Sequence, residues 1–564
     1  MMKFLIKLDF LWQSLLLRIY VAVYSRNFKF IKLFRCKFDS KLLKLVSEAI
    51  EKTHENISHR GFEIQNWIII DKNQDSPKPS IALASQEQEY EHIDFNATFN
   101  DPEDSMALHR FNWALFSLES EKTTGRVKDI LSLIERWINT DKAALKHSAF
   151  GAYTISERII AWSYITIIAE SLNLIRSELL DKIYASVNEQ LSILLSELEY
   201  HNKYTNNHIL NNARALFVAG TVFGNNKAVK VGEYILKKET SDMIINGVLN
   251  EDSTNYQILL TKNYIEVFNV AVRSGNETFA GFMAPYIAEM LKVCRALQGP
   301  GGFYPFIGDI SPDCAPSWTA GYPFTSDKIT VSKWFNLINP VLPDYTDSVN
   351  INKSGNINWL LLENDGFKVT IVAKNGIKCH GHNDNGSISV FNGKDEYIID
   401  PGLYGYDLSN PFAAKQISSR GHNTPIINNT CADIERGALF TPTGFRSNFK
   451  LVESGANSLK YRINYYDRSV SLNRSITIEN AALKICDTVF LKGSADEYEC
   501  NWLLPDKFKD NFDFILTNQG FKITDNKFFF SKKYGILDEC RIISISGKIK
   551  SGESVELILR PNRK

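Results

Sequence analysis

The run SVSLNRSITI, residues 469–478, determines the fold class of the C-terminal part of this chain. It is short and rich in β-branched residues, and a second run of the same kind, LKICDTVFL, follows at residues 483–491. Runs of this length and composition between turn residues are typical of β-strands. This part of the chain is therefore predicted to be a β-domain.

Similar runs recur from residue 350 to the end. Two are bounded by turn sequences, Asn364-Asp365-Gly366 and Asn392-Gly393, which are typical of tight hairpin turns. The further predicted strands are residues 359–363, 367–373, 387–391, 397–399, 499–504 and 555–559. We expect residues 350–564 to form a β-sandwich domain.

In residues 40–345 the apolar residues recur with a different period. Apolar residues recur there at spacings of three and four, which is the pattern of helices with one buried face. The clearest segments are residues 127–138, 156–172, 179–198, 209–223 and 279–297. Short polar connections separate them, so we expect a helical domain of many antiparallel hairpins over residues 40–345.

The composition is that of an ordinary globular protein large enough for two or three domains. Its 564 residues are 44% hydrophobic and 23% charged, and the formal net charge is zero. The eight cysteines form no C-x-x-C pair, which excludes a cysteine zinc ribbon and gives no sign of a disulfide scaffold. A phosphate-binding glycine loop is also absent, so neither a nucleotide nor a nucleic acid is expected as a partner.

The first 39 residues form a separate basic, amphipathic segment. Residues 1–37 carry eight basic residues against Asp9 alone, a net charge of +7, interleaved with Trp12 and several leucines. This pattern is typical of a helix lying on an anionic membrane surface, and equally of a leader helix packed on the protein. The longest uncharged run, residues 10–17, is too short to span a bilayer and makes a poor signal peptide.

Three of the ten histidines lie within a short stretch that also carries carboxylates. His380 and His382 flank a glycine in the run HGHND at residues 380–384, with Asp400 and His422 further on. We expect His380 and His382 on the same face of a strand. Imidazole and carboxylate are zinc ligands, so His382, Asp400 and His422 are predicted to hold one zinc ion. The alternative is that these are hydrogen-bonding strand residues followed by a simple turn at 400–402.

Two polar clusters in the helical half are further candidates. Asn206, Asn207 and His208 open the helix predicted at 209–223, where one asparagine is explained as a cap but the other two residues are not. Residues 247–257, GVLNEDSTNYQ, deliver Tyr256 to the start of another helix.

The order of these motifs resembles the heparinase II/III family of bacterial polysaccharide lyases. The resemblance covers roughly residues 90–430, with a consistent β-sandwich tail. It rests on N-N-H-x-L at residues 206–210, G-V-x-x-E-x-S-x-x-Y at 247–256, P-x-I-G-D at 305–309, H-G-H-N-D at 380–384, I-D-P-G at 399–402 and H-N-T at 422–424.

The resemblance implies an α+β multidomain fold, with an N-terminal incomplete α/α toroid followed by a C-terminal antiparallel β-sandwich and an active site in the cleft between them. It implies β-elimination of an acidic, uronic-acid-containing polysaccharide. Asn207 and His208 would stabilise the charge that develops on the uronate, and Tyr256 would act as acid, or as acid and base in turn. His380 would be the catalytic histidine, and the zinc on His382, Asp400 and His422 would be structural.

The chain departs from the family pattern at two positions. Gln257 stands where many members have histidine, and Ile417 stands where an arginine is usual. Tyr264 is a second candidate for the role of Tyr256. The alternatives are a glycan-binding protein of little or no activity in polysaccharide assembly or export, and a glycoside hydrolase with two carboxylates. We expect a bacterial protein in the cytoplasm or at the inner membrane, with the periplasm as the alternative.

Overall fold

The computed structural model describes residues 39–51, 80–120, 123–142, 145, 147–200, 206–299, 302–314, 340–344, 352, 358–374, 379–433, 447–493 and 495–562. The basic segment predicted at residues 1–39 lies outside this part of the chain except for Asp39. Among the helices that are described, none combines the length and the apolar character needed to cross a bilayer.

The described residues form two compact units that interleave along the chain. The first takes those within 1–243, 262–285 and 333–343, and the second takes those within 244–261, 286–332 and 344–564. The sequence pattern suggests one boundary near residue 350, whereas two segments of the helical region group with the strands. Helices α11 (Thr254–Arg273) and α12 (Glu277–Leu297) contribute residues to both units.

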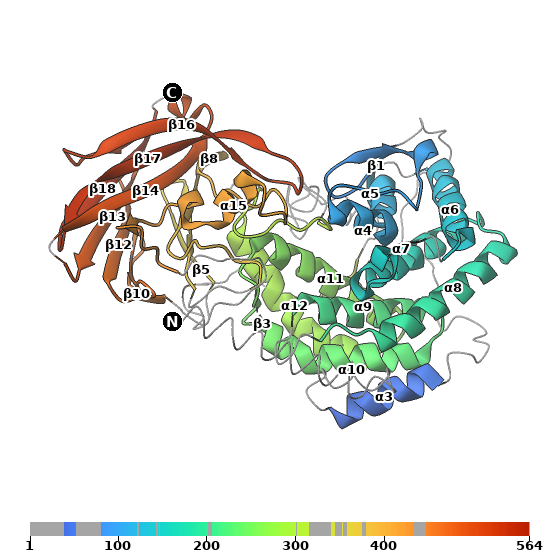
Figure 1. Cartoon of the computed structure of the whole chain (residues 1–564). Coiled ribbons are helices and arrows are strands. Elements are labelled where there is room, and N and C mark those ends of the chain that lie inside the picture. Colours follow the sequence, from blue (N-terminus) through green and yellow to red (C-terminus); the bar gives the residue numbers. More distant parts are fainter. Residues whose placement is uncertain are drawn as a thin grey trace, which may run out of the picture. The chain divides into compact units, whose positions relative to one another are not determined.

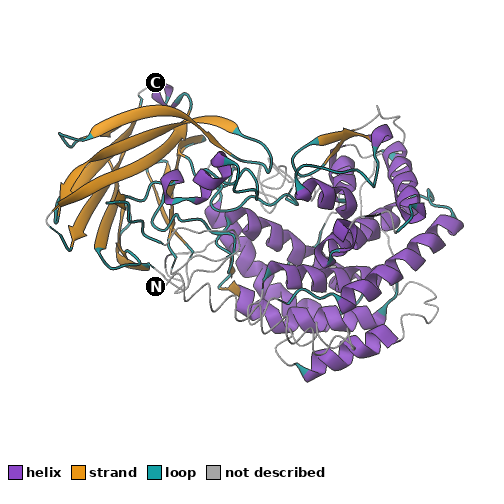
Figure 2. Ribbon diagram, viewed as in Figure 1, coloured by secondary structure: helices purple, strands orange, loops and turns teal. Residues whose placement is uncertain are grey.

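The first unit is built mainly from helices (Figures 1 and 2). The helices expected at residues 127–138, 156–172, 179–198, 209–223 and 279–297 are confirmed as α6, α7, α8, α9 and α12. The helices outside α11 and α12 are α3 (Ser40–Glu51), α4 (Pro102–Arg110), α5 (Asn112–Ser120), α6 (Thr124–Asn139), α7 (Ala152–Ser171), α8 (Ser177–Ser196), α9 (Asn207–Val222) and α10 (Asn226–Met243). Strands β1 (Ser80–Ala82) and β2 (Glu87–Glu89) form a small hairpin.

Helix α7 lies at the centre of this unit. Every residue from Thr154 to Ala169 is buried, and the helix packs against α4, α8 and α9. Its sequence is apolar on all sides, as expected for an interior helix. The buried guanidinium of Arg158 donates to the carbonyl oxygens of His109 (3.0 Å) and Ala149 (2.8 Å), and its Nε donates to Gln190. The charge is therefore solvated by the protein itself.

The second unit contains three antiparallel sheets of four or more strands, drawn in orange in Figure 2. In spatial order, the first is β10 (Asn448–Ser454), β11 (Ser458–Asn464), β12 (Val470–Glu479), β13 (Ala482–Leu491), β18 (Ser554–Pro561) and β15 (Phe512–Leu516). The second is β16 (Lys522–Phe530), β17 (Asp538–Lys550), β14 (Ala495–Pro505) and β9 (Ile426–Ile427). The third is β5 (Trp359–Asn364), β6 (Phe367–Val372), β7 (Ile388–Asn392) and β8 (Asp395–Ile398).

The sheets pack as a sandwich because their strands alternate in burial. In β12, Val470, Leu472, Arg474, Ile476 and Ile478 are buried, while the residues between them are half-buried. The buried residues of the six-stranded sheet join those of β5–β8, β14 and β17 in one apolar cluster. The expected strands at 469–478 and 483–491 are therefore confirmed as β12 and β13.

One buried charge of β12 braces the loops that carry the candidate site. The guanidinium of Arg474 makes two hydrogen bonds, of 2.6 and 2.7 Å, to the carboxylate of Asp487 on β13. It also donates to the carbonyl oxygens of Gly386 (3.0 Å) and Asn423 (2.7 Å). These two residues follow the HGHND run and His422, so the sheet fixes the ends of both loops.

Candidate functional site

The HGHND run is not a strand, contrary to the sequence-based expectation. Residues 379–386 form turns and irregular backbone. The backbone of His380 bonds to other loops instead of a neighbouring strand, because its N–H donates to Glu251 O (3.2 Å) and its carbonyl accepts from Asp309 N (2.9 Å). Gly381 permits this approach, since a Cβ there would lie 2.7 Å from the Cβ of Asp252.

The imidazole of His380 is held between two carboxylates. Its Nδ1 lies 2.9 Å from Asp309 Oδ2, and its Nε2 lies 3.1 Å from Glu251 Oε2. Burial opposes a charge on the ring, but the two carboxylates outweigh it and raise the pKa of His380 to about 9. The ring is therefore an imidazolium at neutral pH, and each of its nitrogens faces a carboxylate oxygen.

Asp309 serves two histidines at once. Its Oδ1 lies 3.0 Å from Nε2 of His382, while Oδ2 contacts His380. Burial alone would raise the pKa of this carboxyl group, but the hydrogen bonds from the two histidines hold it below its usual value. Asp309 belongs to the P-x-I-G-D motif of the family resemblance and is one of the loop carboxylates available to the alternative of a glycoside hydrolase.

Hydrogen bonds hold the segments that carry Glu251 and Asp309 together. The hydroxyl of Thr254 donates to Pro305 O (2.6 Å), and Thr254 N donates to Ile307 O (3.0 Å). Gly308 has φ +79, and a Cβ there would lie 2.7 Å from the carbonyl oxygens of both Asp252 and His380. Only glycine adopts this conformation at so close an approach without strain.

Tyr256 lies directly over the imidazolium of His380. The two ring centroids are 3.6 Å apart and the planes are nearly parallel, at 12°. Tyr256 sits in the first turn of α11, where its N–H donates to the hydroxyl of Ser253 (3.2 Å). Burial raises the pKa of the Tyr256 phenol well above its ordinary value, although a hydrogen bond with Tyr406 partly offsets this. The phenol is therefore protonated at neutral pH.

Tyr406 completes the pair and was missed in the sequence. Its hydroxyl lies 2.9 Å from the hydroxyl of Tyr256, and its half-buried ring packs edge-on against Tyr534. The backbone N–H of Tyr406 donates to the hydroxyl of Tyr534 (3.3 Å). No local pattern distinguishes this tyrosine among the 23 in the chain, because its partner is 150 residues away.

Asn207 and His208 lie in the first unit, at the N-terminus of α9. Asn206 is the cap, since its side chain accepts a hydrogen bond from Ile209 N (3.2 Å). Asn207 is buried, whereas His208 is half-buried, with Nδ1 3.1 Å from Glu199 Oε1 and its ring 4.7 Å from that of Tyr153. The carboxylate of Glu199 thus orients the imidazole of His208.

A possible metal centre in the second unit consists of Asp384, Asp400 and His422. All three are buried, and one ligand atom from each lies within 4.8 Å of the other two. His422 Nδ1 is 3.2 Å from Asp400 Oδ2, and its Nε2 is buried without a hydrogen bond. Burial opposes protonation of His422, but the nearby Asp400 outweighs it and raises the pKa of the ring. Two of the three predicted zinc ligands therefore lie together, with Asp384 as a further donor.

His382, the third predicted ligand, lies beside this group. Its ring centroid is 5.4 Å from that of His422, and its Nδ1 is buried without a hydrogen bond. Its Nε2 contacts Asp309. Unpartnered buried nitrogens are rare in proteins, so two in adjacent rings suit a cation between them. The ligand role of His382 stays a prediction.

A buried lysine borders the same group. Lys374 Nζ pairs with Asp384 Oδ1 and donates to the carbonyl oxygen of His382 (2.8 Å). Burial would lower its pKa, but Asp384 and Asp252 outweigh this and raise it. The ammonium group therefore neutralises part of the carboxylate charge. Asp400 also caps its own turn, because its Oδ1 accepts from Gly402 N (3.3 Å).

The two departures from the family pattern have structural roles. Gln257 is fully buried and closes the hairpin of β3 (Ile244–Ile245) and β4 (Val248–Leu249), accepting from Leu249 N (2.7 Å) and donating to Gly247 O (2.9 Å). Ile417 packs its side chain in a small apolar cluster, and its carbonyl accepts from Asn383 N (3.0 Å). Tyr264, the alternative tyrosine, is buried with its hydroxyl 2.8 Å from that of Thr240.

The comparisons with known proteins agree with this architecture. Residues 351–529 match the family model described as heparinase II/III-like, C-terminal. The second unit carries a heparinase II/III-like domain. The family resemblance seen in the sequence is thereby confirmed for this part of the chain. No curated protein sequence matches the chain.

Solved structures extend the likeness to most of the chain. A mutant of heparan sulfate lyase HepC from Pedobacter heparinus is 14% identical with a TM-score of 0.57, covering 93% of this chain and 88% of that one. A structure of heparinase III is 15% identical with a TM-score of 0.61, covering 83% of this chain and 79% of that one. These likenesses confirm the predicted fold of an incomplete α/α toroid followed by an antiparallel β-sandwich.

The arrangement predicts that Asp309 is essential to the stability of the second unit. Asp309→Asn keeps the shape of the side chain but leaves the His380 imidazolium with one carboxylate instead of two. Because a buried charge that loses a partner is costly, we expect the free energy of unfolding to fall by about 2–4 kcal/mol. Urea unfolding measures it, with the exposed Asp395→Asn as control. Equal stability of both variants would contradict a stabilising role of Asp309 toward the His380 imidazolium.

Proposed function

We propose that this protein is a polysaccharide lyase that cleaves a uronic-acid-containing glycan by β-elimination. The observation that carries the proposal is the phenol of Tyr256, whose ring is stacked on the buried imidazolium of His380 and whose hydroxyl lies 2.9 Å from that of Tyr406. Its fold, shared with structures titled heparan sulfate lyase and heparinase III, supports the same reaction class.

The difficult step in this reaction is removal of the proton at C5 of the uronate. The electron pair left behind spreads into the adjacent carboxylate, which already carries a negative charge. Positioned hydrogen-bond donors stabilise that charge in a water-poor site. We assign this role to the amide of Asn207, which lies beside His208 at the start of α9.

The tyrosine pair would handle the protons. The raised pKa of Tyr256 keeps its phenol protonated, so it can act as the acid that donates to the departing glycosidic oxygen. Tyr406 shares a hydrogen bond with Tyr256 and is less buried. It can therefore return a proton from solvent to the Tyr256 phenol after that phenol has donated its own. In this assignment Tyr256 is the acid and Tyr406 its relay, while His208, whose Nδ1 faces Glu199, takes the C5 proton on Nε2 as the base.

His380 would position Tyr256 instead of taking the substrate proton. A base needs an unprotonated nitrogen, and both nitrogens of His380 face carboxylates. The flat stack of the imidazolium on the phenol fixes the ring of Tyr256 and places a positive charge against its face. The hydroxyl then needs no reorganisation during the reaction.

The test compares three tyrosine variants on a panel of uronic-acid polysaccharides. Tyr256→Phe should lower turnover at least about 100-fold, and Tyr406→Phe by about 10-fold or more, with glycan affinity nearly unchanged. Formation of the unsaturated uronate product is followed by its ultraviolet absorbance. Tyr264→Phe is the matched control, because it also removes a buried tyrosine hydroxyl, one that bonds to Thr240, and it should stay active.

The alternatives give different results in the same assay. A glycan-binding protein without turnover would bind a polysaccharide but release no absorbing product from the wild type. A glycoside hydrolase would release reducing ends without ultraviolet absorbance. Full activity of Tyr256→Phe would contradict the assignment of the acid even if the wild type is a lyase.

We further propose that a zinc ion ties together the loops that carry Asp384, Asp400 and His422, with His382 beside it. The donor set fits, since carboxylates and imidazoles are zinc ligands and the open nitrogens of His382 and His422 are buried. Such an ion would be structural, adding binding free energy to the stability of the fold.

Elemental analysis of protein purified without added metal should therefore find close to one zinc per chain. His422→Ala should lose the zinc and lower the thermal midpoint, while the exposed His92→Ala should change neither. His382→Ala separates the two ligand sets, because it loses zinc only if His382 is a ligand. A metal-free wild type of unchanged stability would contradict the proposal.

We also propose that residues 1–37 hold the protein at an anionic membrane surface. Their net charge of +7 and their interleaved apolar residues support this, at roughly 1 kcal/mol per basic residue near such a surface. The full-length protein should co-sediment with anionic liposomes at low salt, and deletion of residues 1–37 should release it. Neutral liposomes serve as the control, and equal binding by both forms would contradict the role.

A further inference from the structure

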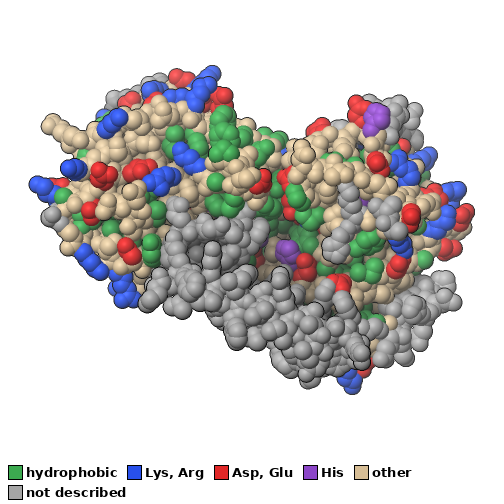
Figure 3. Space-filling model, viewed as in Figure 1, with side chains coloured by type: hydrophobic (Ala, Val, Ile, Leu, Met, Phe, Trp, Pro, Cys, Tyr) green, Lys and Arg blue, Asp and Glu red, His purple; other side chains and the backbone are tan. Residues whose placement is uncertain are grey.

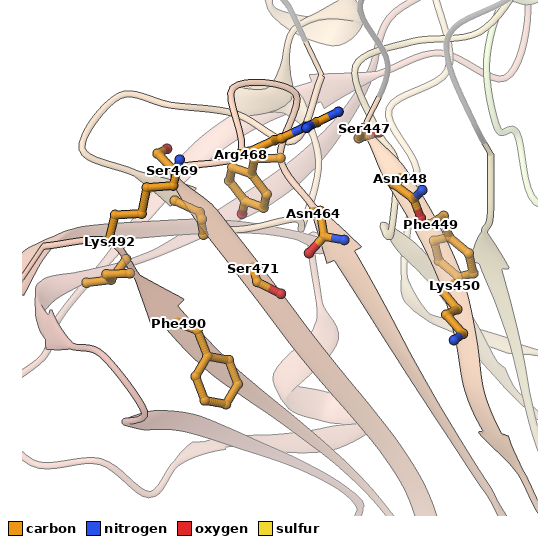
Figure 4. Close-up of a pocket in the computed structure, with 13 residues that line it drawn as sticks. Ser447, Asn448, Phe449, Lys450, Asn464, Arg468, Ser469, Ser471, Phe490 and Lys492 are labelled. Atoms are coloured by element: carbon orange, nitrogen blue, oxygen red, sulfur yellow. The ribbon is translucent and has the colours of Figure 1, made fainter.

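A groove crosses the outer face of the six-stranded sheet, away from the site of Tyr256 and His380 in the chain. Its volume is about 900 Å³, and its lining includes Lys450, Asn464, Arg468, Ser471, Phe490 and Lys492 (Figure 4). The floor follows the strand register, because Asn464 on β11 faces Ser471 on β12, which faces Phe490 on β13. Neighbouring strands lie about 4.8 Å apart, so the row of three residues spans about 10 Å.

The charged groups that line the groove all have one sign. They are Lys450, Arg468 and Lys492, and no lining residue is acidic. All three are exposed, and within the described residues none of them makes an ion pair. Over the surface shown in Figure 3, by contrast, acidic and basic side chains of the second unit are interspersed.

Two nearby carboxylates hydrogen-bond to serines of the groove lining. Asp467, beside Arg468, accepts hydrogen bonds from the backbone N–H (2.9 Å) and the hydroxyl of Ser469. Asp433 accepts from Ser447 at the end of the groove. Both carboxylates thus face serine donors, and within the described residues neither forms an ion pair with Lys450, Arg468 or Lys492.

The uncharged lining suits a carbohydrate. Phe490 is 43% exposed at one end of the row, where its ring can pack against the apolar face of a sugar. The amide of Asn464 and the hydroxyl of Ser471 offer donors and acceptors for sugar hydroxyls. An antiparallel sheet often has one solvated face, but a solvated face needs neither a hollow nor charges of a single sign.

We propose that this groove is a second binding site for an acidic polysaccharide, separate from the catalytic tyrosines. Lys450, Arg468 and Lys492 would bind the carboxylate or sulfate groups, and Phe490 would carry a sugar ring. A long glycan held there raises the effective concentration of its other segments near the protein, whereas a short one gains nothing. The site needs no turnover, so it stands or falls independently of the lyase reaction.

The experiment measures binding in the Tyr256→Phe background, so that cleavage does not interfere. The probes are heparan sulfate, alginate and the neutral glycan dextran. Calorimetry measures the affinity of the protein for each of them. The groove variant combines Lys450→Gln, Arg468→Asn and Lys492→Gln. Asparagine is chosen because Arg468 has φ +59, which asparagine tolerates. Its matched control is Lys394→Gln, Lys507→Gln and Lys527→Gln, which removes three exposed charges outside the groove.

We expect the groove variant to bind at least one acidic glycan about tenfold or more weakly, and the control to bind it like the parent. Phe490→Ala should weaken glycan binding several-fold at low and at high salt, since salt screens the attraction between charges but not the packing of a sugar on the ring. In the otherwise wild-type enzyme, the groove variant should raise KM for polymer but leave cleavage of short oligosaccharides unchanged.

Several results would overturn the proposal. Equal losses in the groove variant and the control would mean diffuse attraction between polyions. Binding of neither acidic glycan by the parent, or equal binding of dextran, would exclude the assigned ligand. A groove variant that loses affinity for anionic vesicles but keeps its affinity for glycan would make the surface a membrane contact.

Discussion

The second unit depends on one buried charge, the imidazolium of His380 between Glu251 and Asp309. Taking such ions out of water is costly, and the cost is offset only where several good contacts converge. Here they do, because the backbone of His380 also bonds to the same two segments. Three stretches of chain are thereby fixed around one ring, and Tyr256 is placed against its face. The catalytic proposal follows from this geometry more than from any single motif.

The two residues that depart from the family pattern make structural contacts around the site. Gln257 and Ile417 make contacts that hold the surrounding loops, so their side chains support the site from outside it. Arg474, on the sheet, also holds these loops by donating hydrogen bonds to the carbonyl oxygens of Gly386 and Asn423. The loops around Tyr256 and His380 are thus held by contacts from Gln257, Ile417 and Arg474.

Much of the fold can be read from sequence because it follows from local periodicity. The runs at 156–172 and 469–478 repeat their apolar residues with the periods of a buried helix and a half-buried strand, and both formed as expected. The HGHND run was mistaken for a strand because its backbone partners, Glu251 and Asp309, lie far away in sequence. Only tertiary contacts distinguish Tyr406, and only they show that Asp384, the last residue of that run, lies beside Asp400 and His422.

The long separations within the site have a consequence for how the protein is made. Asp309 and His380 are 71 residues apart, and the two tyrosines that share a hydrogen bond are 150 residues apart. Contacts between distant segments form late, because the intervening loop must be closed before they stabilise anything. A nascent chain that has emerged only as far as α12 therefore carries Tyr256 without its partners. The cluster of Tyr256, His380 and Tyr406 can therefore assemble only after synthesis has passed residue 406.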